Sequence, residues 1–189
     1  MSTFAILVEY RQAFVAGLKV TLQLCSIIWT VGLLVGSGLG VASRRWRVWI
    51  GWPARFFSFF LSGIPVLVML FWLHYPLQSM LGVVIDPFIT AAVALSLVNI
   101  VAVADLVRGI LLDFPTQYLV AAKVCGLTQR QTVVEIELPI VLRQILPGLL
   151  VIQVNMLQMS LFASLISVDE IFRICQRINA QIYFDVVTA

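Results

Sequence analysis

The stretch AAKVCGLTQRQTVVEIELP, residues 121–139, is a charged, helix-favouring segment between long apolar parts of the chain. Gly126 tolerates a left-handed backbone, so it suits the C-cap of a helix that ends just before it. Residues 128–131, TQRQ, have the spacing of a capping box, which predicts the start of a second helix. We expect this second helix to run to about Leu138 and to end at Pro139. The stretch therefore predicts a helix–turn–helix.

The composition of the 189-residue chain is that of a membrane protein. The chain is 61% hydrophobic and 11% charged, whereas soluble domains are roughly 45–50% apolar and about 25% charged. With a mean hydropathy of +1.05, it cannot cover itself with polar surface, so lipid is its natural solvent. The net charge of +3 does not indicate nucleic-acid binding, because the basic residues are not gathered on one soluble face.

The cysteines and the N-terminus carry little functional signal. Cys25, Cys125 and Cys175 lie far apart and show neither metal-ligand nor disulfide spacing, so we expect no metal site. The N-terminal apolar stretch, Phe4 to Val8, is too short for a signal peptide, and no basic region precedes it. We expect the first membrane span to act as its own uncleaved targeting signal.

Four apolar segments are long enough to cross a bilayer. We expect spans at about residues 20–42, 56–78, 87–106 and 145–168, and a polar loop at about 108–143. The first span would reach roughly 35 Å, more than the ~30 Å hydrocarbon core. Residues 1–19 are expected to form a short interfacial helix, and a fifth span is expected to be missing or to begin after residue 182. This predicts an all-α, polytopic transmembrane helical bundle, with one membrane domain over residues 1–189.

Three local features shape these spans. Gly32, Gly36 and Gly40 share one helix face, which predicts a close contact with another helix. Pro65 lies inside the second span, removes a backbone hydrogen bond and predicts a kink or break. Asp86 can cap the third span, since Pro87 suits a first helical turn.

Basic residues set the expected orientation of the chain. They concentrate between the first and second spans and between the third and fourth, at Arg44, Arg45, Arg47, Arg55, Arg108, Lys123, Arg130 and Arg143. By the positive-inside rule both connections are cytoplasmic. The N-terminus, the loop 79–86 and the tail 169–185 are then expected outside.

The arrangement A-A-x-x-x-G-(nine residues)-I-x-L-P resembles the cytoplasmic EAA loop of ABC importer permeases, which docks on the ATPase subunit. Its positions are Ala121, Ala122, Gly126, Ile136, Leu138 and Pro139. Most of the chain resembles the polar amino-acid (histidine/glutamine/glutamate/arginine-type) permeases, with matching stretches at 17–22, 62–69, 101–109, 138–147 and, in part, 158–161. Val120 stands where the family's loop usually carries Glu.

The resemblance implies a type I permease-like fold in the bacterial inner membrane. It implies that the chain moves a polar amino acid or related solute by alternating access and is not itself an enzyme. The implied partners are an ATPase dimer that binds ATP and Mg, a second permease subunit, identical or homologous, and a periplasmic or extracellular solute-binding protein. A passive channel or secondary transporter without an ATPase is the alternative. A membrane hydrolase is disfavoured, because the sequence has one His and neither H-E-x-x-H nor G-x-S-x-G.

Polar residues inside the spans are candidates for the solute path or for bonds between helices. They are Gln153, Ser160, Ser164 and Ser167 on one face of the fourth span, Asn155 and Gln158 on the opposite face, and Ser96 and Asn99 on the third span. Asp105 and Arg108, three residues apart near the inner boundary, are expected to form an ion pair.

Overall fold

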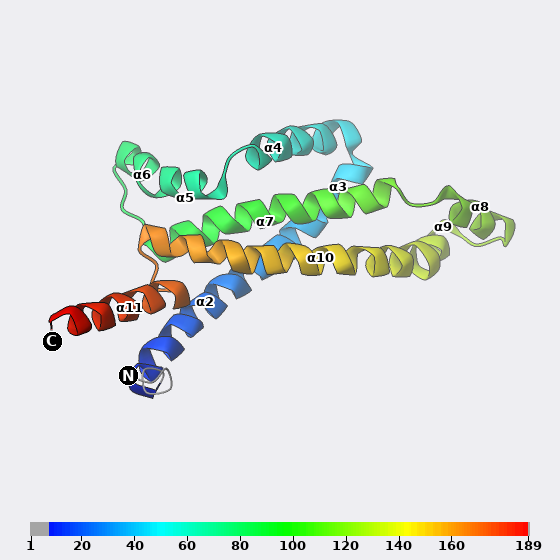
Figure 1. The fold of residues 1–189 in the computed structure, drawn as a ribbon. Coiled ribbons are helices and arrows are strands. Elements are labelled where there is room, and N and C mark those ends of the chain that lie inside the picture. The colour runs from blue at the N-terminus through cyan, green and yellow to red at the C-terminus, as the bar shows by residue number, and fades with distance from the viewer. Residues whose placement is uncertain (1–7, 189) are drawn as a thin grey trace. The chain divides into compact units, whose positions relative to one another are not determined.

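The computed structural model describes residues 8–188, with side chains described as far as residue 184. Every regular element among these residues is a helix, which confirms the all-α fold (Figure 1). Of the stretch Phe4 to Val8, only Val8 lies among the described residues. Within residues 8–188, three helices are long and apolar enough to cross a membrane, and a fourth crossing results if one broken helix pair forms a single span.

The chain divides into two compact units. One comprises Met1–Thr30, Ile64–Leu97 and Met156–Ala189, and the other comprises Val31–Gly63 and Val98–Asn155. The polar loop at about 108–143 belongs to the second unit, which therefore contains the candidate site built on that loop. The single membrane domain over residues 1–189 stays a prediction.

The first span is longer than the sequence predicted. It consists of α2 (Arg11–Val31), the π-helical segment η1 (Gly32–Gly36) and α3 (Ser37–Arg45), which follow one another as a 35-residue helix. Residues 11–19 therefore belong to the long first-span helix, because α2 already begins at Arg11. A short interfacial helix before Arg11 stays a prediction, since only residues 8–10 of that part are described. No proline interrupts this part of the chain, so a helix once formed continues to grow residue by residue.

The glycines of the first span allow a close approach to α7 (Pro87–Leu112), as predicted. A Cβ atom at Gly36 would lie 2.7 Å from the carbonyl oxygen of Ile100, and one at Gly40 would lie 2.8 Å from Cβ of Val107. Real Cβ atoms essentially never come so close, so only glycine fits at these positions. The contact is one of backbone against helix, a common way for membrane helices to associate.

Gly36→Leu is expected to disrupt this helix pair, because the added side chain meets the α7 backbone and cannot rotate away. Gly38, in α3, offers a matched control, since a Cβ there meets nothing within 4 Å. We expect the yield of monodisperse protein in detergent to fall several-fold for Gly36→Leu and to stay unchanged for Gly38→Leu. Equal yields for the two variants would contradict the close contact.

The second span is broken, as Pro65 predicted. Its elements are the π-helical η2 (Arg47–Gly51), α4 (Trp52–Ser62), α5 (Val66–His74) and α6 (Pro76–Leu81). The backbone leaves helical conformation at residues 63–65, where Pro65 adopts ψ 131°. The helical segments that flank this break are the pair that could together form the fourth crossing.

The third span begins as predicted but runs further. The Asp86 carboxylate accepts a hydrogen bond from the N–H of Phe88 at 2.8 Å, which confirms the cap. The helix α7 ends at Leu112, six residues beyond the expected boundary, and the next segment contains Pro115. Arg108 does not end the helix, because its charge is paired within it, as described below.

The fourth span corrects the prediction for Pro139. The elements α9 (Gln129–Gln131), η3 (Thr132–Glu137), α10 (Leu138–Ser160) and the 3-10 helix η4 (Leu161–Ile166) form one 38-residue helix. Pro139 therefore lies inside a helix and does not end it. A proline cannot donate the usual bond and its ring crowds the preceding carbonyl, and the wider π-helical turns of η3 lie directly before it.

The last helix, α11 (Ile171–Thr188), is held to α2 at its first turn. The side chain of Glu170 is fully buried and accepts hydrogen bonds from two N–H groups of that turn at 2.9 Å. The N–H of Ile171 donates to Oγ1 of Thr21 at 3.1 Å, and Gly17 leaves room for the approach. A fifth span after residue 182 stays a prediction.

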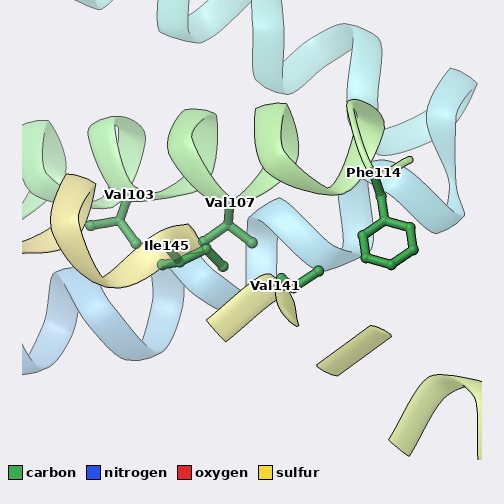
Figure 2. Close-up of a cluster of buried hydrophobic side chains, with 5 residues drawn as sticks. All are labelled: Val103, Val107, Phe114, Val141 and Ile145. Carbon is green, nitrogen blue, oxygen red and sulfur yellow. The ribbon is translucent and has the colours of Figure 1, made fainter. Parts of the chain in front are cut away.

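A buried apolar cluster in the second unit packs the start of the loop against α7 and α10 (Figure 2). Val103 and Val107 come from α7, Val141 and Ile145 from α10, and Phe114 from the connection that leads into the loop. Each of these side chains is at most 7% exposed. The start of the loop thus packs into the same apolar core that joins α7 to α10.

Candidate functional site

The polar loop begins with α8 (Thr116–Val124), whose end is closed as predicted. Gly126 has a left-handed backbone with φ +73°. Its N–H donates to the carbonyl of Lys123, and the N–H of Leu127 donates to that of Ala122, both at 3.0 Å. This pair of bonds is a Schellman motif, which turns the chain sharply at the end of a helix.

The second loop helix starts with the predicted capping box. The N–H of Gln131 donates to Oγ1 of Thr128 at 3.4 Å, and the N–H of Thr128 donates to Oε1 of Gln131 at 2.9 Å. Because this helix then runs on into α10, the second half of the loop is continuous with the fourth span. The helix–turn–helix is confirmed, and α8 packs against η3.

The structure separates the two alanines that were expected to act together. Ala122 is 1% exposed and lies inside the loop, so it offers no surface to a partner. Ala121 and Gly126 are exposed, and a Cβ at Gly126 would meet nothing within 4 Å. Of the two alanines of the loop motif, only Ala121 is therefore open to a partner, because the helix turns successive residues to different sides.

The other predicted loop residues divide in the same way. Ile136 is half-buried, whereas Leu138 and Pro139 are exposed on the outside of the helix. Their exposure does not by itself assign them a role in docking, which stays a prediction.

The loop also exposes apolar side chains that are not part of the predicted motif. On α8, Val120 is 60% exposed and Val124 is 83% exposed; on η3, Val134 is 55% exposed. We call these three valines, with Ala121 and Gly126, the loop surface. The four-residue spacing of the two valines on α8 was visible in the sequence and would have placed them on one helix face.

An ion pair joins the loop to the first span. Nη1 of Arg44, near the end of α3, donates a hydrogen bond to Oε1 of Glu137, the last residue of η3. The Glu137 side chain is 11% exposed and that of Arg44 is 36% exposed. The two residues are 93 positions apart, so no local sequence pattern could have paired them.

A second charged group lies between α4 and α7. Nη2 of Arg108 donates to Oδ1 of Asp105 at 2.7 Å, so the predicted ion pair is present. The hydroxyl of Ser58 also donates to Oδ2 of Asp105. Ser58 and Asp105 are 47 positions apart, so no local sequence pattern indicated that Asp105 would bind α4 as well as Arg108.

Two of the polar candidates inside the spans bond to each other. Nδ2 of Asn99 donates to Oε1 of Gln153 at 3.1 Å, and Nε2 of Gln153 lies 3.4 Å from Oδ1 of Asn99. Gly32 packs directly against the Asn99 side chain. This amide pair therefore joins α7 to α10 next to Gly32 of the first span. Bonding between helices was one of the two predicted roles for these residues.

The serine candidates are also turned inward. The buried hydroxyls of Ser160 and Ser164 donate to carbonyl oxygens of their own helix at 2.7 Å. The hydroxyl of Ser96 is buried and has no hydrogen-bond partner among the described residues. By contrast, Asn155 and Gln158 are exposed on α10, on the face that was predicted to lie opposite.

Comparison with known proteins decides the family. The family model for the inner membrane component of binding-protein-dependent transport systems matches residues 32–179. The chain belongs to this family. The matched region includes the loop surface, the Arg44–Glu137 pair and all three apolar helices in whole or in part.

Individual relatives of the permease agree with this assignment. The chain is 32% identical over 181 residues to the octopine transport system permease protein OccM of Rhizobium meliloti, with 90% of this chain and 73% of the relative covered. It is 26% identical over 174 residues to the probable amino-acid ABC transporter permease protein YckA of Bacillus subtilis, with 92% and 76% covered. A solved amino acid ABC transporter with histidines has the same fold, with TM-score 0.84 and 24% identity, over 97% of this chain and 85% of that one.

These findings confirm the prediction of an ABC importer permease that was made from the loop. The permease is a multi-pass protein of the inner membrane. The loop between α7 and α10 is the EAA loop of this family.

Proposed function

We propose that this permease is the membrane subunit of an ATP-driven importer and carries a polar amino acid or a related small solute by alternating access. The family and the amino-acid ABC transporters among the proteins it resembles support this solute class. They also favour it over a passive channel or a secondary transporter, which would have no ATPase partner.

ATP and Mg are proposed to bind to a separate ATPase dimer, which hydrolyses the nucleotide. In support, the sequence contains no G-x-x-x-x-G-K-[ST] phosphate-binding loop. A second permease subunit, identical or homologous, would complete the membrane part. A periplasmic or extracellular binding protein would deliver the solute, in keeping with the name of the family.

The observation that carries this proposal is the construction of the EAA loop. It exposes apolar side chains at Val120 and Val124, outside the three apolar helices, and at Val134, near the start of the third of them, where a subunit can cover them. The same loop continues without a break into α10 and is paired to α3 through Glu137. A movement imposed on the loop surface would therefore reach two spans.

For the solute path we propose the exposed face of α10 at Asn155 and Gln158. Amide side chains on a membrane-crossing helix are costly against lipid, so this face is expected to meet water, solute or the second permease subunit. Asn99 and Gln153 are proposed only to hold helices together, since their amides bond to each other. Ser96, Ser160 and Ser164 are buried and are not proposed to touch solute.

Replacing both amides, Asn155→Leu with Gln158→Leu, is expected to reduce uptake about tenfold or more, because the path loses its hydrogen-bonding groups. The variant should still fold, since both positions are exposed. Val151→Leu, at another exposed position of α10, is the control and should transport normally. Normal uptake by the double variant would show that this face lies elsewhere than on the path.

The proposed function is tested with the permease reconstituted in liposomes together with a candidate ATPase and a candidate binding protein. We expect uptake of a radiolabelled amino acid that requires both ATP and the binding protein, and that unlabelled polar amino acids inhibit. Uptake at the same rate without ATP would contradict an ATP-driven importer. ATP-dependent uptake of a different solute only would contradict the solute class.

A further inference from the structure

An apolar groove opens at the cytoplasmic ends of the spans, within the second unit. Its volume is about 610 Å³, which is in the range of pockets that bind small ligands. Side chains of α3, α7 and α10 form its walls, and they include Val41, Leu111, Leu142 and Leu149. Nine of the 14 lining residues are apolar, so most of the groove suits a hydrocarbon chain, while Arg44, Arg45, Gln129 and Glu137 make part of it polar.

The groove leads to a more polar cavity of about 460 Å³. The two cavities share Arg44, Gln129 and Glu137 in their linings; Arg45 lies on the groove side and Lys123 on the other side. This end therefore carries three cations and one carboxylate, and the carboxylate is already paired with Arg44. The remaining positive charge favours an anionic group.

Aromatic residues place the charged end at the surface of the membrane. Trp46, Trp49 and Trp52 are 52%, 85% and 70% exposed, and they follow directly after α3. Exposed tryptophans gather at the level of the lipid headgroups. The guanidinium of Arg45 lies 5.9 Å from the centre of the Trp46 ring and so shares that level.

We propose that this site binds an anionic phospholipid of the cytoplasmic leaflet. One acyl chain lies in the groove, and the phosphate lies at its polar end, near Arg45 and Lys123. Basic pockets between membrane helices on the cytoplasmic side bind acidic headgroups in this way. A soluble phosphate would use the polar end but not the apolar walls, so the combination of the two indicates a lipid.

The test uses the permease purified with its partner subunits and exchanged into detergent with phosphatidylglycerol or with phosphatidylcholine of the same acyl chains. Native mass spectrometry then counts the lipid retained. We expect preferential retention of phosphatidylglycerol. Arg45→Gln should lower it about fivefold, the effect of one basic residue near an anionic headgroup. Val41→Trp should abolish it by filling the groove.

Two matched controls separate the site from the rest of the surface. Arg55→Gln removes an exposed arginine of α4, and Val48→Trp enlarges an exposed residue of η2; neither lines the groove. Both should retain phosphatidylglycerol as the unmodified protein does. Equal retention of the two lipids, or unchanged retention in Arg45→Gln and Val41→Trp, would overturn the proposal.

A photoreactive amino acid at position 41 identifies the occupant directly. Crosslinking to phosphatidylglycerol is the expected result. Crosslinking to another protein subunit instead would overturn the proposal and assign the groove to a protein contact.

Discussion

Gly126→Trp and Ala121→Trp are each expected to abolish solute-stimulated ATP hydrolysis and uptake, with insertion and expression unchanged. Both positions are exposed on the loop surface, and a Cβ at Gly126 meets nothing within 4 Å, so an indole there projects outward. It would hold a docked ATPase away from Val124 and from the backbone turn. We expect a loss of at least about tenfold in reconstituted activity, which corresponds to roughly 1.4 kcal/mol of docking energy.

Control variants separate blocked docking from local strain. Gly126 has φ +73°, a conformation that costs most side chains about 1–2 kcal/mol but that Asn tolerates. Gly126→Asn should therefore retain most activity. Ala122→Trp is not a useful variant for docking, because Ala122 is 1% exposed and the indole would force α8 from η3.

Val120 stands where the family's loop usually carries Glu, and restoring Glu there tests whether the loop accepts a carboxylate at this position. Val120 is 60% exposed, so Val120→Glu should be tolerated by the loop itself. If both Trp variants take up solute at the normal rate, the loop surface does not couple to the ATPase.

The features of the loop that could be predicted from sequence are those made by neighbouring residues. The Schellman turn at Gly126 and the capping box at Thr128 each depend on a few consecutive positions, and both are present. The burial of Ala122 depends on how α8 packs against η3, which local patterns do not specify. The prediction that Pro139 ends the helix is wrong for a related reason. The helix continues past this proline, and π-helical turns precede it.

For the polar groups inside the spans, too, the sequence predicts the helix face of a residue but not its partners. Helical periodicity correctly put Asn155 and Gln158 on the face opposite Ser160 and Ser164. It could not tell which face is buried, because that depends on neighbouring helices. Nor could it pair Gln153 with an amide 54 positions away. Long-range partners are fixed by packing, and the Arg44–Glu137 ion pair, which joins residues 93 positions apart, is also of this kind.

Reversing one charge of the Arg44–Glu137 ion pair is expected to separate ATP hydrolysis from transport. Glu137→Arg would place a second guanidinium beside Arg44, where the carboxylate now accepts its hydrogen bond. Breaking a fully buried pair costs about 3–5 kcal/mol, but the Arg44 side chain is 36% exposed, so we expect about 2 kcal/mol here. The loop surface would remain intact, so the ATPase should still copurify with the variant.

Because the loop would lose its link to α3, its movement would no longer be passed on fully to the first span. We expect uptake per ATP hydrolysed to fall about tenfold in Glu137→Arg and in Arg44→Glu. The double exchange, Arg44→Glu with Glu137→Arg, restores opposite charges and should recover most of the ratio, as a double-mutant cycle requires of residues in contact. Arg55→Glu, which reverses an exposed charge of α4, controls for the change in net charge. If the single reversals transport normally, or if the double exchange is as defective as either single reversal, the ion pair does not transmit the movement of the loop.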